Sequence, residues 1–298
     1  MNIPQPNQQD MQIGAEQVMN MMPGAGIFVG VGAKSANKTM LKKAKSMASH
    51  GAGRKEIWNK TGWFKDVDSQ WKYEINDREA SFNKLRKSED ELLYRNENVG
   101  QAYDHPEAVG SYVGLENIKI RQSVPPNSGA YSKDGNYIDI GVSANPKDTA
   151  LHELQHAIQA KANFGRGGST DNVWSSGQYK DELAKEMAIQ LEPMSLKDFI
   201  ARESHGRPSP DLDDIRQKYQ DYLERLSLWK AHNDPLDYLN SPAQNKAGYN
   251  IYKRLGGEVE SRNVERRMDL TPEQRMVSPP WETIDVKEDQ IINRFYPE

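Results

Sequence analysis

The sequence predicts an α+β fold with a small twisted sheet, one central helix and a mainly helical C-terminal half. Apolar side chains alternate with polar ones at Trp71, Tyr73 and Ile75, which is typical of a half-buried strand. After Asn145-Pro146 the apolar residues change to helical spacing. From about residue 179 onward the chain is strongly charged, keeps helical spacing and is interrupted by prolines. These observations put the sheet in the first half and most helices in the second.

Composition narrows the classes of function. The chain has 298 residues, enough to bury a sizeable core without cross-links, and it has no cysteine. Disulfides, thiolate zinc sites and cysteine nucleophiles are therefore excluded, and a metal must be held by histidine and carboxylate side chains. Lys and Arg number 39 against 43 Asp and Glu, a net charge of −4. This balance gives no global electrostatic case for binding nucleic acid or an anionic membrane.

The domain organisation predicted from the sequence is simple. We expect residues 1–23 to be a mobile tail and residues 24–298 a single domain, with a sheet and helix part (24–170) and a helical part (171–298). The apolar stretch Gly26–Gly32 is far shorter than the ~20 residues of a membrane span. No Lys or Arg precedes it, unlike in a secretory signal. We therefore expect neither a membrane span nor secretion through a signal peptide.

The first elements follow from spacing and turn residues. Lys34–His50 has helical spacing with lysines on the solvent face. An aromatic block, Ile57–Phe64, and the strand Trp71–Ile75 flank the turn-like Asp66–Gln70, which predicts a hairpin. We interpret the tryptophans of this region as the core of a small sheet, because large aromatics usually supply buried area. The alternative is a platform that stacks bases or sugars.

Two further strands are expected at Ile118–Val124 and Tyr137–Val142, with Gly129 in the loop between them. A helix then runs to about Ala162 and ends at the glycine-rich Gly165–Ser169. That segment follows a helix, so it lacks the context of a phosphate loop. The later helices are expected at Tyr179–Leu191, Leu196–Glu203, Asp211–His232 and Ala243–Met268, before an irregular tail from Thr271 that packs back through Trp281.

The most specific motif is H-E-x-x-H, formed by His152, Glu153 and His156. Residues four apart share one helix face, so both imidazoles can reach one ion. By chance the motif occurs in roughly one such sequence per hundred. Glu153 lies beside the pair, suited to deprotonate a metal-bound water, whose pKa Zn²⁺ lowers to about 7. The motif therefore predicts Zn²⁺ ligands at His152 and His156 and a catalytic Glu153.

A catalytic zinc ion needs a third protein ligand and an open position. The favoured candidate is Glu258, because Gly256-Gly257 would let its helix approach the motif helix closely. Glu260 and Glu265 are the other carboxylates considered on that segment. His205 lies in a loop rich in Gly and Pro and His232 at a helix end, settings that favour solvated or capping roles for both.

Taken together, these motifs resemble a zincin-type metallopeptidase domain of bacteriophage and mobile-element proteins, one of the large polyvalent protein associated domains. The pieces that carry the resemblance are Ile57-Trp58 to Trp63-Phe64, Trp71–Asp77, Leu151–Gln159, Gly257–Val264 and Pro279–Glu282. It implies a phage or prophage origin and action in a bacterial host cytoplasm or in the virion, with phage virion proteins as possible partners. Zincins with a glutamate ligand commonly use G/N-E-x-x-A/S-D, in which the Asp orients a histidine ligand. This chain has Arg262 at that position.

The sequence thus predicts a zinc-dependent hydrolase that cleaves a peptide or isopeptide bond in a protein or peptide. Glu153 would act as general base and then proton donor. Arg262, His232 or a tyrosine would stabilise the developing oxyanion. One alternative is a non-enzymatic virion or ejected protein that keeps the zincin fold. Another is a nucleic-acid binder that uses the Lys34–Lys45 helix and the tryptophans, which the net charge argues against.

Overall fold

The computed structural model describes residues 26–76, 80–82, 97–121, 128–141, 146–165, 167–168, 173, 181–182, 185, 195–204, 211–231 and 242–293. The expected tail 1–23, His205 and His232 lie outside the described residues. The chain divides into two compact units: the first holds the described residues of Met1–Gly168 and Lys253–Phe295, and the second those of Ser169–Tyr252.

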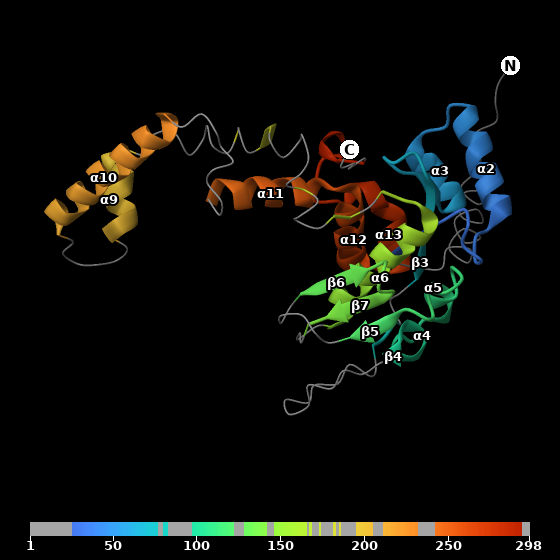
Figure 1. Cartoon of the computed structure of the whole chain (residues 1–298). Helices are drawn as coiled ribbons and strands as arrows, with labels where there is room; N and C mark the ends of the chain where they lie inside the picture. Colours follow the sequence, from blue (N-terminus) through green and yellow to red (C-terminus); the bar gives the residue numbers. More distant parts are fainter. Residues whose placement is uncertain are drawn as a thin grey trace, which may run out of the picture. The chain divides into compact units, whose positions relative to one another are not determined.

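The fold is mixed α and β, with two small sheets and several helices (Figure 1). The first unit contains β1 (Gly26–Gly30), α2 (Lys38–Ser49), α3 (Arg54–Thr61), β2 (Trp63–Lys65), β3 (Trp71–Asn76), β4 (Glu97–Asn98), α4 (Val99–Ala102), α5 (Pro106–Val109), β5 (Lys119–Arg121), β6 (Gly129–Ser132), β7 (Tyr137–Ile140), α6 (Pro146–Ala162), α12 (Gly256–Arg267), α13 (Pro272–Val277) and the 3₁₀ turns Pro280–Glu282 and Glu288–Gln290. Among the described residues, no helix has both the length and the apolar character of a membrane span.

The remaining helices are α9 (Leu196–Ser204), α10 (Leu212–Ala231) and α11 (Pro242–Arg254). In the second unit α9 packs on α10, where the ring of Phe199 lies 5.2 Å from that of Tyr219 and 5.5 Å from that of Tyr222. This small aromatic cluster is what joins the two helices, and the predicted helical character of both segments is confirmed.

The first sheet has the order β1-β3-β2 and is antiparallel throughout. The predicted hairpin is confirmed as β2 and β3, but part of the aromatic block forms α3, which ends at Gly62 in a left-handed conformation (φ 71°). Trp58 and Trp63 are 2% and 1% exposed. The interpretation of these two tryptophans as core is therefore confirmed, and they cannot stack bases.

The expectation of a half-buried β3 is wrong, because both faces of the strand are covered. Lys72 and Glu74, the polar residues of the alternation, are only 1% and 5% exposed. Lys72 contacts Glu260 of α12, and Glu74 contacts Arg267 of the same helix. Alternation of polar and apolar residues normally marks one solvated face. Here the polar face is buried because charges on α12 compensate those on the strand.

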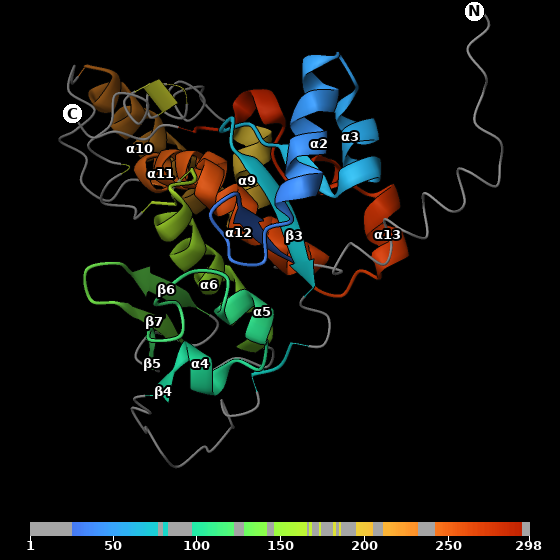
Figure 2. The ribbon, with the colours of Figure 1, turned by 90° about the vertical axis from the view of Figure 1, so that its right-hand side faces the viewer.

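The second sheet has the order β4-β5-β7-β6, with β5 parallel to β7 and β6 antiparallel at the edge (Figure 2). The predicted strands at 118–124 and 137–142 are confirmed as β5 and β7, and residues 122–124 and 142 of those predictions lie outside the described residues. β6 was missed, since its first residue, Gly129, was read as part of a loop. The central helix α6 packs on β6, β7 and β1 and so connects the two sheets.

The C-terminal part departs from expectation in two places. The predicted helix 243–268 is divided into α11 and α12 by Leu255, which has extended backbone angles and bridges Ile292. The tail from Thr271 is not irregular throughout, because Thr271 and Gln274 form a capping box that starts α13. The expected packing of Trp281 onto the body is confirmed, since its ring contacts those of Trp58 and Phe64.

A buried charge cluster holds α12 against β3. The Glu74 carboxylate accepts hydrogen bonds from Arg267 Nε at 2.6 Å and Nη2 at 2.8 Å, and from Arg275 Nη1 at 2.8 Å. Arg267 and Arg275 are 0% and 2% exposed. Removing the anion would leave two buried guanidinium groups without their counter-charge, which is far more costly than losing an exposed pair.

We predict that Glu74→Gln lowers the free energy of unfolding by about 3–5 kcal/mol. The measurement is urea unfolding followed by circular dichroism. Glu56→Gln is the matched control, because Glu56 forms an exposed pair with Lys60, and such pairs contribute about 0.3–0.5 kcal/mol. Equal losses in the two variants would show that the buried cluster does not hold the fold together.

Candidate metal centre

The two histidines of the motif lie side by side on α6. The opposite face of the helix is anchored by fully buried apolar residues, Leu151, Leu154 and Ile158. This leaves His152 and His156 on a common face, with ring centroids 4.8 Å apart and an interplanar angle of 74°. Both imidazoles are mostly buried, with side chains 12% and 13% exposed.

Glu258 in the first turn of α12 completes the group. Its Oε2 lies 3.4 Å from His152 Nε2, and its Oε1 lies 3.3 Å from His156 Nε2. One ligand atom from each of the three residues falls within 4.8 Å of the others. The start of α12 lies directly against α6, because Gln159 Nε2 donates to the carbonyl oxygen of Gly257 at 2.9 Å. The glutamate is 2% exposed, so its charge faces the imidazoles and not solvent.

The other carboxylates considered as third ligand have different partners. Glu260 accepts hydrogen bonds from Lys72 and from Gln155. Glu265 contacts His152 at Nδ1, the nitrogen that faces away from Glu258. Neither therefore lies where both Nε2 atoms meet. His205 and His232 are outside the described residues, so the structure says nothing of them.

The Nδ1 atoms of both imidazoles have partners that orient the rings. His152 Nδ1 is bonded to Glu265, while His156 Nδ1 is bonded to Gln159 Oε1 at 2.8 Å and contacts Ser261 Oγ at 3.3 Å. Such partners set the tautomer that leaves Nε2 available to a metal. The expected aspartate position holds Arg262, yet Glu265 takes the orienting role. Glu265 follows Glu258 by seven residues, or about two helical turns, which places both on the same face of α12. This spacing is the sequence pattern from which the role of Glu265 could have been predicted.

The electrostatics of the group favour a positive charge. Burial lowers the pKa of His152, but its hydrogen bonds to Glu258 and Glu265 outweigh burial and raise that pKa to about 10. The pKa of His156 is raised in the same way, with Glu258 outweighing burial. Burial raises the pKa of Glu153, which is 5% exposed. Two imidazoles enclosed by carboxylates form a site in which a proton or a metal cation is stabilised.

Two glycines allow close approach to these side chains. A Cβ on Gly129 of β6 would lie 2.5 Å from Glu153 Oε1. A Cβ on Gly167 would lie 2.4 Å from Glu258 Oε1 and 2.5 Å from His156 Cε1. All three distances are shorter than any tolerated contact, so only glycine fits at either position without a shift. The sequence indicates only loop positions for both glycines, because their packing partners are distant in the chain.

The space between a second group of carboxylates is occupied by the ammonium group of a lysine. Asp66, Asp68 and Glu260 surround Lys72 Nζ, which lies 2.8 Å from Asp66 Oδ2 and 2.9 Å from Asp68 Oδ2. Burial lowers the pKa of Lys72, but the three negative charges outweigh it and leave the pKa raised. The ammonium group occupies the position that a cation would take, so these carboxylates are structural.

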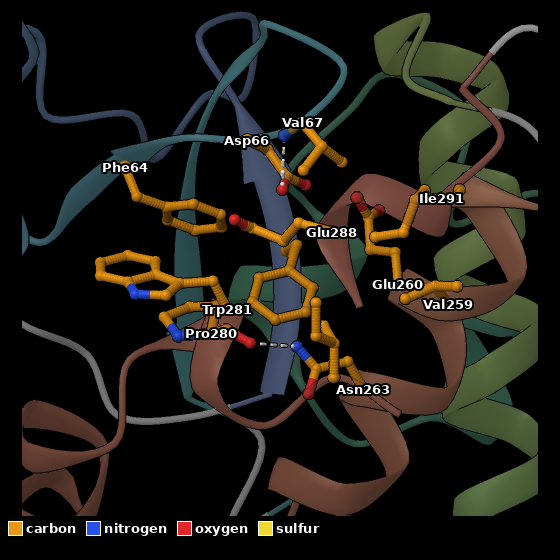
Figure 3. A pocket seen from close by; sticks show the side chains of 13 residues that line it. Phe64, Asp66, Val67, Val259, Glu260, Asn263, Pro280, Trp281, Glu288 and Ile291 are labelled. Carbon is orange, nitrogen blue, oxygen red and sulfur yellow. Dashed lines mark hydrogen bonds between the residues drawn. The ribbon is translucent and has the colours of Figure 1, made fainter. Parts of the chain in front are cut away.

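A small pocket opens beside α12, away from His152, His156 and Glu258, which we call the metal group (Figure 3). Figure 3 shows the side chains that line it, with Phe64 and Trp281 on one side and Val259 and Glu260 on the other. Its charged members are paired with side chains of the protein, since Asp66 and Glu260 contact Lys72 and Glu288 contacts Arg54. His152, His156 and Glu258 are not among its lining residues.

Comparison with known proteins gives one match. Residues 26–83 match the family model of large polyvalent protein associated domain 23, which is consistent with a domain of that type. No curated protein and no solved structure matches the chain. The matched segment holds β1, α2, α3, β2 and β3, whereas the histidines of α6 and the glutamate of α12 lie beyond it. The similarity therefore concerns the first sheet and its helices.

Proposed function

We propose that the chain is a zinc-dependent hydrolase of the zincin-like kind, encoded by a phage or mobile element, that cleaves peptide or isopeptide bonds. The observation that carries the proposal is the convergence of two imidazole nitrogens and one carboxylate at the buried start of α12, with Glu153 beside them. The match to a large polyvalent protein associated domain supports the phage or mobile-element origin.

The donor set fits a zinc ion. Zinc is bound by histidine nitrogen and carboxylate oxygen at about 2.0–2.2 Å, and two ligands of a tetrahedral ion are then about 3.4 Å apart. Glu258 Oε2 lies 3.4 Å from His152 Nε2, and the other carboxylate oxygen, Oε1, lies 3.3 Å from His156 Nε2, so each imidazole has one carboxylate oxygen at about this spacing. Two nitrogens and one oxygen also leave the fourth position open, as catalytic zinc sites do. His152, His156 and Glu258 would hold the ion.

Hydrolysis would need two groups, a bound zinc ion and the carboxylate of Glu153. A bound zinc ion supplies Lewis acidity, which polarises a carbonyl oxygen and lowers the pKa of water. The Glu153 carboxylate accepts the proton from the attacking water and returns it to the leaving amine. Burial raises the pKa of this carboxyl group, which makes the carboxylate a stronger base.

The strand beside Glu153 supports the proposed substrate class. β6 is the edge strand of the second sheet and pairs with β7 on one side. Its Gly129 lies against the Glu153 carboxylate. An extended peptide can add to such an edge through main-chain hydrogen bonds, which would bring its own carbonyl groups toward Glu153. This arrangement supports a protein or peptide substrate.

Arg262, one of the oxyanion donors considered from the sequence, has hydrogen-bond partners within the protein. Its Nε donates to Asp285 Oδ2 at 2.8 Å and its Nη2 to Asp285 Oδ1 at 3.1 Å. Nη2 also contacts the carbonyl oxygen of Lys253. These contacts use Nε and Nη2, and those to Asp285 join α12 to the segment that holds this residue.

We predict that the purified protein binds one zinc ion per chain and that alanine at His152, His156 or Glu258 abolishes stoichiometric binding. Glu265→Gln should weaken zinc binding by about 10–100-fold, because it removes the partner that orients His152. Isothermal titration calorimetry and metal analysis after dialysis measure both effects. Glu56→Gln, an exposed carboxylate, is the control and should leave the affinity unchanged. A wild-type chain that holds no zinc contradicts the assignment.

We predict that Glu153→Gln retains zinc yet lowers hydrolysis by at least about 100-fold, the usual contribution of a general base. The assay is the cleavage of a mixture of quenched fluorescent peptides by the zinc-loaded protein. Unchanged cleavage in the variant would remove Glu153 from the reaction. Failure of the zinc-loaded wild type to cleave any peptide would overturn the peptidase proposal while leaving the metal site intact.

A further inference from the structure

The first thirty described residues carry a strong local charge that the net charge conceals. Residues 26–55 contain no Asp or Glu, while the chain as a whole has a net charge of −4. The cations of this segment are Lys34, Lys38, Lys42, Lys43, Lys45, Arg54 and Lys55. At physiological salt, charges act over about 8 Å. A partner at this surface therefore responds to the local charge and not to the total.

The lysines of α2, with Lys34 just before it, are exposed and uncompensated. All five are exposed, and within the described part of the chain none forms an ion pair. The neighbouring Lys55 and Lys60 differ, because they pair with Glu282 and Glu56. Isolated cations of this kind gain most from an external anion, since no internal partner has to be displaced.

The helix arranges these charges in a row. At about 100° per residue, Lys38, Lys42 and Lys45 lie within about 60° of one another and extend about 10 Å along the axis. Lys43 extends the exposed face to one side. The helix is firmly held, because Asn37 caps its first turn through Met40 N at 3.0 Å and its inner face packs on α3 and β2. We call Lys34, Lys38, Lys42, Lys43 and Lys45 the basic face.

The surroundings of the basic face select the kind of polyanion. The large apolar residues of α2 are directed inward: Leu41 is buried, and Met40 and Met47 pack on the core. The helix thus offers no large apolar side chain to insert into a lipid bilayer, as interfacial helices do. The nearby Trp58 is buried too, so stacking of single-stranded bases is absent there. With lipid insertion and base stacking excluded, the basic face is suited to contact the regularly spaced charges of a polyanion backbone.

We propose that the basic face binds the phosphate backbone of double-stranded nucleic acid without sequence preference. A duplex presents one negative charge per about 1.7 Å of its axis, a density that a row of lysines can match. The face belongs to α2 and the chain just before it, whereas the metal group belongs to α6 and α12. Binding at this face is therefore independent of the proposed hydrolysis.

The experiment compares duplex DNA affinity at several salt concentrations by fluorescence anisotropy. If four lysines of α2 contact phosphates, the affinity should fall about 100-fold between about 50 and about 200 mM salt. The variant Lys38→Gln, Lys42→Gln, Lys45→Gln leaves one of these contacts, so its affinity should fall only about 3-fold over the same range. Two duplexes of unrelated sequence should bind equally well.

The control is Lys55→Gln, Lys60→Gln, Lys218→Gln, which makes the same charge change at exposed lysines that already pair with carboxylates. It should retain the wild-type salt dependence, and circular dichroism should show that both variants are folded. Equal weakening by the two triple variants would overturn the proposal, as would weak binding with no salt dependence. Binding to anionic phosphatidylserine vesicles but not to DNA would also overturn it and identify a membrane surface as the partner.

Discussion

The carboxylate of Glu260 is the constraint on which the arrangement of α12 depends. A buried anion is stable only when donors surround it, and here they come from two other elements. Lys72 of β3 contacts one carboxylate oxygen, while Gln155 and Gln159 of α6 donate to the other at 2.5 Å and 3.2 Å. Any rotation or sliding of α12 would leave this charge unpaired. The strand and both helices are therefore held in one register.

The position of the metal group follows from that register. Glu258 lies two residues before Glu260 on the same helix, and its carboxylate faces the two imidazoles. On α6, histidines and glutamines each recur at a spacing of four, at 152 and 156 and at 155 and 159. The glutamines hold α12 in place while the histidines face Glu258. Packing and the geometry of the three candidate ligands thus come from one interface, so damage to either affects both.

The two proposed activities rest on separate parts of the first unit. The basic face lies within residues 26–83, which match a large polyvalent protein associated domain, and the metal group lies outside them. The net charge of the whole chain does not report the local charge at the basic face, because an acidic chain can hold a segment of thirty residues without a carboxylate. Because the two groups of residues do not overlap, the two proposed properties can be separated by mutation.

The sequence by itself determined the features that depend on a single helix, strand or hairpin and on composition. Spacing alone put His152 and His156 on one face of a helix, and the missing cysteines restricted further ligands to histidine and carboxylate. The core role of the tryptophans and the β2–β3 hairpin were also predictable from local pattern.

Only the tertiary structure decided which acidic side chain of α12 faces the histidines, that Lys72 is buried, and that Gly129 begins a strand. Local periodicity orients side chains around one axis. The partner of each face, about 100 residues away in the chain for α6 and α12, is chosen by the compensation of buried charges, which no local pattern encodes.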